Sequence, residues 1–201
     1  MPITKNRENI RKLTELAILT AIVLALQLFA SVIRIGPFSI TLVLIPIIIG
    51  AATLDPFSGA WLGFVFGIAV LLSGDAAFFL GFSVPGTVAT VLIKGTLCGL
   101  AAGLVYRALA KKSRTLAVYT AAVVCPVVNT GAFLLCSRLF LYDAVRNLAA
   151  QSDWKQGIFL YMIIGMVGIN FVVEFVIDIV LAPAIVRILD HLGHRPVSHY
   201  E

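Results

Sequence analysis

Residues 16–25 read LAILTAIVLA, an apolar run in which three alanines, Ala17, Ala21 and Ala25, stand four residues apart. On an α-helix, residues four apart lie on one face, so these alanines form a smooth stripe that another helix can approach closely. The common use of such a stripe is packing against a helix of the same chain. The alternative is a contact surface for a separate protein.

The composition indicates a membrane protein that crosses the bilayer several times. Of 201 residues, 60% are hydrophobic and 12% are charged, and the mean hydropathy is +1.03. A soluble domain of this length has too little interior to hide so much apolar surface. Apolar runs of about twenty residues, the length that crosses a bilayer as a helix, recur along the chain. The first run is too long for the apolar part of a signal peptide, so we expect it to be retained as a span.

Glycine, proline and polar segments divide the chain into six expected spans within one all-α transmembrane domain, residues 1–201. Segments 73–85 and 142–155 are expected to be loops on one side of the membrane. The last span is longer than one crossing needs, so we expect one of its ends to emerge into water. The expected spans are about 13–33, 39–54, 57–72, 86–109, 116–141 and 157–189.

The distribution of Lys and Arg predicts the orientation in the membrane. With the N-terminus in the cytoplasm, the inner segments carry ten of these residues and the outer loops carry three, Arg34, Arg146 and Lys155. Basic residues concentrate on the cytoplasmic side of membrane proteins. An even number of spans then places both termini inside, which is an N-in, C-in topology.

Small residues also recur at helical spacing in the third and fourth expected spans. Each span has a ladder of three glycines four residues apart, which lets two helix backbones approach closely. For these ladders we favour packing within the chain. The ladders are Gly59, Gly63 and Gly67, and Gly95, Gly99 and Gly103.

Lys94 lies near the middle of the fourth expected span, too deep for its ammonium to reach the membrane surface easily. A charged group at that depth costs about 2.5–3.5 kcal/mol on insertion scales, so it needs a partner. One interpretation is that it binds an anionic ligand, especially a carboxylate. The other is an internal ion pair with Glu174 or Asp178.

Two asparagines in the fifth and sixth expected spans are candidate ligand-binding residues. The amides of Asn129 and Asn170 can each donate and accept hydrogen bonds, which suits a polar ligand. Hydrogen bonding between helices is the alternative for Asn129. Glu174 and Asp178 follow Asn170 on the same helical face, farther from the outer surface. Their roles stay open between structure and cation or proton binding.

The expected outer loop 73–85 is rich in aromatic residues, among them Phe78 and Phe79, and in glycine. Such a loop could close over a binding site and exclude water. It could equally rest among the lipid headgroups, where aromatic side chains are common.

Motifs of several enzyme classes are absent from the sequence. There is no phosphate-binding G-x-x-x-x-G-K-[ST] loop, no H-E-x-x-H and no G-x-S-x-G. The three cysteines, Cys98, Cys125 and Cys136, fall in apolar runs and have no metal-site spacing. We therefore expect a protein that is not an enzyme and uses no cofactor, metal or nucleic acid.

Together, six short spans, the alanine stripe and the turn R-I-G-P-F-S-I-T-L at residues 34–42 resemble the substrate-binding S components of energy-coupling factor (ECF) vitamin transporters, which have a riboflavin-transporter-like bundle. The resemblance covers roughly residues 10–190. It implies a bacterial-type plasma membrane protein that works with a T component and two ATPase subunits. It also implies that Ala17, Ala21 and Ala25 dock the T component.

The same resemblance implies an outward-opening vitamin pocket. Lys94, Asn129 and Asn170 would hold the ligand, with Phe78 and Phe79 at the lid. The segments I-T-L-V-L-I-P-I-I-I-G-A and G-A-W-L-G-F-V-F-G look most like the branch that binds pantothenate. Branches that bind folate, riboflavin or cobalamin are alternatives.

The residues alone also allow two other classes of function. A self-sufficient secondary carrier could use Glu174 and Asp178 as ion sites. A structural subunit without a ligand would pair Lys94 with Glu174.

Overall fold

A computed structural model describes residues 2–30, 34–35, 38–39 and 42–191 of the chain. The described residues form helices joined by short turns, together with one pair of two-residue strands. The order is α1 (Pro2–Ala30), β1 (Arg34–Ile35), β2 (Phe38–Ser39), α2 (Leu44–Thr53), α3 (Pro56–Leu72), α4 (Ala77–Leu80), α5 (Val84–Ala110), α6 (Arg114–Phe140), α7 (Tyr142–Gln151), α8 (Ile158–Leu160), the π-helix η1 (Tyr161–Met166) and α9 (Gly168–His191).

Four of these helices are long and apolar enough to cross a membrane: residues Asn9–Ala30 of α1, α5, α6 and α9. Helices α2 and α3 are apolar but shorter. At about 1.5 Å per residue, α2 is roughly 15 Å long, half the thickness of the hydrocarbon core. The count of six spans and the N-in, C-in topology stay predictions.

Local sequence explains where the core helices begin. Asp55, Ser83 and Ser113 precede α3, α5 and α6, and each side chain accepts a hydrogen bond from the backbone N–H three residues later. This N-capping satisfies one of the N–H groups that the first turn of a helix leaves without a partner. Proline follows the cap of α3 and of α5, where its missing N–H costs nothing.

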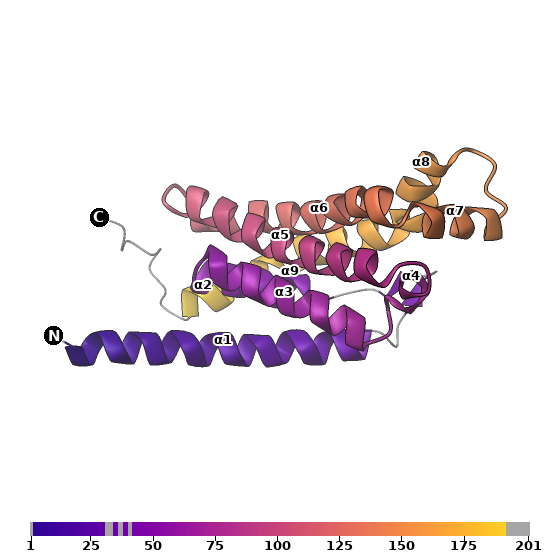
Figure 1. The fold of residues 1–201 in the computed structure, drawn as a ribbon. Helices are drawn as coiled ribbons and strands as arrows, with labels where there is room; N and C mark the ends of the chain where they lie inside the picture. The colour runs from indigo at the N-terminus through magenta and orange to yellow at the C-terminus, as the bar shows by residue number, and fades with distance from the viewer. Residues whose placement is uncertain (1, 31–33, 36–37, 40–41, 192–201) are drawn as a thin grey trace.

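Figure 1 shows the arrangement of the bundle. Helix α1 lies along one side beside α3, while α5 and α6 run together on the opposite side. The short helices α4, α7 and α8 gather at one end, and the first turns of α1 lie at the other. The ion pair between Arg114 at the start of α6 and Asp190 at the end of α9, 2.8 Å long, ties two helices at that other end.

The two glycine ladders pack against each other, which confirms the expected packing within the chain and identifies the partner of each ladder. A Cβ atom added to Gly59 would lie 2.6 Å from the carbonyl oxygen of Gly99, and one added to Gly67 would lie 2.7 Å from that of Val91. Such a Cβ at Gly63 would overlap the carbonyl oxygen of Gly95. The backbones of α3 and α5 are therefore as close as glycine allows.

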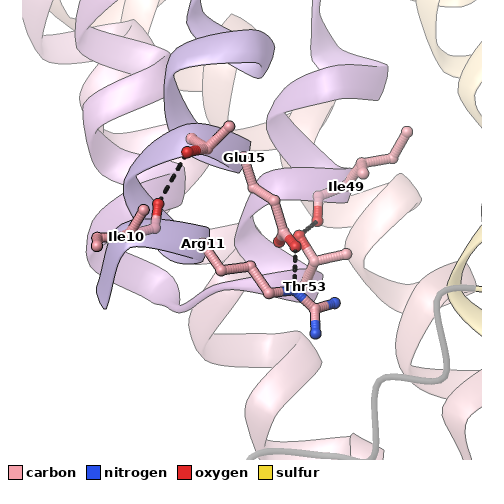
Figure 2. Close-up of polar contacts among 6 residues, drawn as sticks. Ile10, Arg11, Glu15, Ile49 and Thr53 are labelled. Atoms are coloured by element: carbon pink, nitrogen blue, oxygen red, sulfur yellow. Dashed lines mark hydrogen bonds and ion pairs between the residues drawn. The ribbon is translucent and has the colours of Figure 1, made fainter. Parts of the chain in front are cut away.

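Polar contacts join α1 to the α2–α3 region in at least two places. Near the start of α1, Lys12 forms an ion pair with Asp55 in the turn between α2 and α3. Farther along, the indole N–H of Trp61 donates to the hydroxyl of Thr20, 3.3 Å away. Figure 2 shows the contacts near the first of these places, the Arg11–Glu15 ion pair (2.7 Å) and the hydrogen bond from the Thr53 hydroxyl to the carbonyl oxygen of Ile49 (2.9 Å).

Four segments differ from the sequence-based expectations. The expected second span 39–54 includes β2 residue Ser39, and its helix begins only at Leu44. The expected loops 73–85 and 142–155 contain α4 and α7. The expected helix 157–189 is divided into α8, η1 and α9, because the backbone widens into a π-helix at Tyr161–Met166. Part of the turn at residues 34–42 lies outside the described residues.

Candidate functional site

A cavity lies between α1, α3, α5, α6 and α9, at the end of the bundle that carries α4. The cavity has a volume of about 80 Å³, several times the roughly 10–15 Å³ that a single water needs. Its walls combine aromatic rings with charged, amide and hydroxyl groups, a combination typical of a small-molecule site. These residues are Phe66, Phe79, Phe133 and Phe171; Lys94, Asp75 and Glu174; Gln27, Asn129 and Asn170; and Thr87, Thr90 and Thr130, with Val70, Ala76, Val91, Leu141 and Val167 between them.

Lys94 of α5 lies between two aromatic rings on the cavity wall. Its Nζ is 5.3 Å from the ring centroid of Phe66 and 5.3 Å from that of Phe133. Cation–π contacts attract the charge but accept none of the three N–H groups of an ammonium. Within the part of the chain that the structure describes, Nζ makes no hydrogen bond or ion pair. Lys94 therefore offers hydrogen-bond donors and a positive charge to the cavity.

Two carboxylates share the cavity with Lys94. Both Glu174 and Asp75 line it together with Lys94. The expected ion pair of Lys94 with Glu174 or Asp178 is not formed as a direct contact among the described residues. Asp178 is only 1% exposed and lies one turn beyond Glu174 on α9.

Asn129 and Asn170 reach the same cavity from α6 and α9. Asn129 is 5% exposed, and its Oδ1 is buried without a hydrogen-bond partner in the described chain. A buried amide oxygen without a partner is costly, so a ligand N–H or O–H at this position would stabilise it. Asn170 follows the π-helix, and π-helical turns often occur at functional sites.

The two predicted lid residues have different positions. Phe79 of α4 is buried, lines the cavity and packs edge-on against Phe133 with ring centroids 5.9 Å apart. Phe78 does not line the cavity. Its ring packs against that of Phe79 in a T-shaped contact, with ring centroids 5.4 Å apart. Phe82 packs on Phe78 at 5.2 Å. The aromatic cluster makes α4 a cover for one side of the cavity.

The structure adds cavity residues that were not among the predicted site residues. Gln27 of α1 is 1% exposed, and Asp75 lies in the turn before α4. A polar residue inside the apolar first run was the available signal for Gln27. Asp75 carried no such signal, because a turn residue in a membrane protein is usually solvated.

The alanine stripe of α1 faces away from the rest of the bundle. Ala17, Ala21 and Ala25 are all exposed, and Leu13 and Phe29 extend the same face at 68% and 77% exposure. The opposite face, which includes Val23, is buried. Within the described part of the chain the stripe therefore does not serve helix packing, unlike the glycine ladders of α3 and α5.

The described residues contain no group of three or more His, Cys, Asp or Glu side chains arranged to hold a metal ion. The cysteines Cys98, Cys125 and Cys136 are buried free thiols. What the cavity offers is binding through charge, hydrogen bonds and aromatic contacts.

Comparison with known proteins gives one match. Residues 11–186 match the family model of the ECF transporter substrate-specific component, which covers α1 through most of α9. No curated protein and no solved structure gives a significant match. Because the family match extends over most of the sequence, the chain belongs to the substrate-specific component family of ECF transporters, whose members are substrate-binding subunits of transporters and not enzymes.

Proposed function

We propose that this protein binds a carboxylated vitamin, most specifically pantothenate, from outside the cell and delivers it inward with a T component and two ATPase subunits. The observation that carries the vitamin class is the Lys94 ammonium, held between two rings at 5.3 Å with its N–H groups directed to no protein acceptor in the described chain. A ligand carboxylate supplies both the opposite charge and the missing acceptors.

The other cavity groups suit the remainder of such a molecule. The unpartnered Oδ1 of Asn129 can accept from an amide N–H or a hydroxyl, and the Glu174 carboxylate can accept from a second hydroxyl. The rings of Phe79 and Phe171 offer apolar surface to its methyl groups. Pantothenate has a carboxylate, an amide, two hydroxyls and two methyl groups.

We propose the exposed stripe Ala17, Ala21 and Ala25 as the surface that docks the T component in the plasma membrane. Exposure of all three alanines supports this role, because no helix among the described residues covers them. The sequence contains no phosphate-binding loop, so energy from ATP must come from a partner.

The vitamin is tested on protein extracted gently from membranes and analysed by mass spectrometry for co-purified small molecules. Isothermal titration of the emptied protein with pantothenate should then give saturable binding. Binding of folate in place of pantothenate would overturn the vitamin assignment but keep the class of carboxylated vitamins. Binding of riboflavin or cobalamin, which have no free carboxylate, would overturn that class as well. Absence of binding for every vitamin tested would overturn the binding function.

A self-sufficient carrier is the second candidate, because Glu174 and Asp178 are buried at 7% and 1% exposure on one face of α9. Reconstitution of the chain alone in liposomes separates the two. Vitamin uptake driven by an ion gradient without partners would favour the carrier, whereas our proposal expects no uptake until the T component and ATPases are added.

A further inference from the structure

Gln27 is the residue through which α1 reaches the cavity. Its side-chain amide donates to the carboxylate Oδ2 of Asp75 at 2.6 Å and to the Ser73 hydroxyl at 3.4 Å. Gln27 and Asp75 both line the cavity, and Gln27 is 1% exposed. The amide–carboxylate hydrogen bond is part-buried, so it is less exposed to competition from water than a surface bond.

Asp75 stands at the hinge of α4. Gly74 before it has a φ of +79°, a backbone conformation that favours glycine, and the following residues Ala76 and Phe79 close over the cavity. The carbonyl oxygen of Gly74 also accepts the backbone N–H of Ala77, the first residue of α4. Asp75 therefore lies inside the short turn that connects α3 to α4.

Two further polar links between α1 and the α2–α3 region, both among the described residues, lie away from the cavity. Neither the Lys12–Asp55 pair nor the Thr20–Trp61 pair includes a cavity residue. The Gln27–Asp75 hydrogen bond is thus the link that joins α1 to the cavity and to α4 in the described chain. The same helix carries the exposed alanine stripe on its other face.

We propose that Gln27 and Asp75 are positioning residues that hold α4 closed over the cavity and tie its closure to the position of α1. This inference rests on the proposed function, in which α4 covers the ligand and α1 docks the partner. A displacement of α1 by a docking subunit stretches the Gln27–Asp75 bond and releases α4. By thermodynamic reciprocity, opening of α4 loosens the end of α1 that carries Gln27.

The experiment is hydrogen exchange of the purified protein in lipid nanodiscs, without any vitamin. The reporters are amides of the α4 segment that are hydrogen-bonded in the closed structure, including those of Ala77, Leu80 and Phe82. We compare Gln27→Leu, which removes the donor, and Gln27→Glu, which places two carboxylates together. The double variant Gln27→Glu with Asp75→Asn restores a hydrogen bond with donor and acceptor exchanged.

Thr20→Val is the matched control, because it removes a polar link of α1 that lies outside the cavity. We expect Gln27→Leu and Gln27→Glu to speed exchange in residues 76–83 by about fivefold or more, a local opening rather than global unfolding. The end of α1, residues 24–30, should exchange faster as well. The double variant should return both segments to near the wild-type rate, and Thr20→Val should leave α4 unchanged.

Unchanged exchange of α4 in both single variants would overturn the inference. Equal acceleration by Thr20→Val, or no rescue by the double variant, would also overturn it by indicating general loosening of the bundle. These hydrogen-exchange measurements need no ligand. If wild-type protein fails to bind pantothenate, that result overturns the proposed vitamin, while the exchange data still decide the role of Gln27 and Asp75.

Discussion

The carbonyl oxygen of Gly95 in α5 occupies the space where a Cβ of Gly63 in α3 would lie, and Gly63 stands in the same relation to Gly95. The two helices meet at this point through backbone alone. Because the obstacle is a backbone oxygen, no side chain can rotate to make room. Lys94 and Phe66, which face each other across the cavity wall, are neighbours of this crossing in sequence, so the glycine contact sets their separation.

Replacing Gly63 with alanine should destabilise the bundle, because α3 and α5 must separate. Overpacking of this kind costs about 1–3 kcal/mol, which is roughly 2–10 °C in melting temperature for a chain of this size. Thermal unfolding of the detergent-solubilised protein measures it. Gly131→Ala in α6 is the control, since a Cβ at Gly131 has no neighbour within 4 Å. Equal melting temperatures for the two variants would contradict the argument.

Much of the fold follows from apolar periodicity and small residues. The long helices α5 and α6 and the use of the glycine ladders for packing within the chain could be predicted, because helical spacing of apolar and small residues is a local pattern. That the two ladders pack on each other could not, because it depends on how distant segments are arranged. Helix α7 was expected as a loop, since its exposed polar residues lower its overall hydropathy. Its buried Ala144, Val145, Leu148 and Ala149 recur at helical spacing, a signal that composition alone conceals.

Cavity-lining residues could be predicted from the sequence where a charged or amide side chain occurs inside an apolar span. Lys94, Asn129 and Asn170 were identified in this way, and all three line the cavity. Asp75 was not, because its place in the wall depends on a turn at Gly74 and on Gln27 from a distant helix. Contacts between segments so far apart in sequence leave no local pattern.

Lys94→Ala should weaken binding of pantothenate by more than about tenfold, a loss of about 1.4 kcal/mol, because the ligand carboxylate loses its cationic partner. Isothermal titration gives the dissociation constants. Ile93→Ala is the matched control, since Ile93 is the neighbouring residue and lies outside the cavity wall. Unchanged affinity in Lys94→Ala would remove Lys94 from the ligand contacts.

Bulky residues on the alanine stripe should separate binding from transport. Ala17→Trp and Ala21→Trp place a large ring on the smooth surface that a partner helix would contact. Both positions lie on the face of α1 away from the cavity. We expect vitamin uptake by whole cells to be abolished and pantothenate binding by the purified protein to be retained. Val180→Trp, at an exposed site on α9, should leave both unchanged. Loss of binding together with uptake would point to misfolding instead of failed docking.

The turn between α2 and α3 should make stability depend on acid pH. Burial raises the pKa of Asp55, but hydrogen bonds from Lys12 and from Ser58, with the charge of Lys12, outweigh burial and lower it below 3.8. A lowered folded-state pKa means that the charged carboxylate contributes stability above the unfolded pKa. That contribution is lost as the pH falls through the folded-state value.

Asp55→Asn isolates this effect, because asparagine can still cap α3 but carries no charge. We expect wild type to melt above Asp55→Asn at about pH 6 and the difference to shrink as the pH falls below about 4. The side chain of Lys12 is 50% exposed, so the ion pair itself contributes at most about 1 kcal/mol. Lys12→Gln should reproduce most of the loss at neutral pH. A melting difference that stays constant with pH would contradict the role of the Asp55 charge, because a neutral packing defect does not titrate.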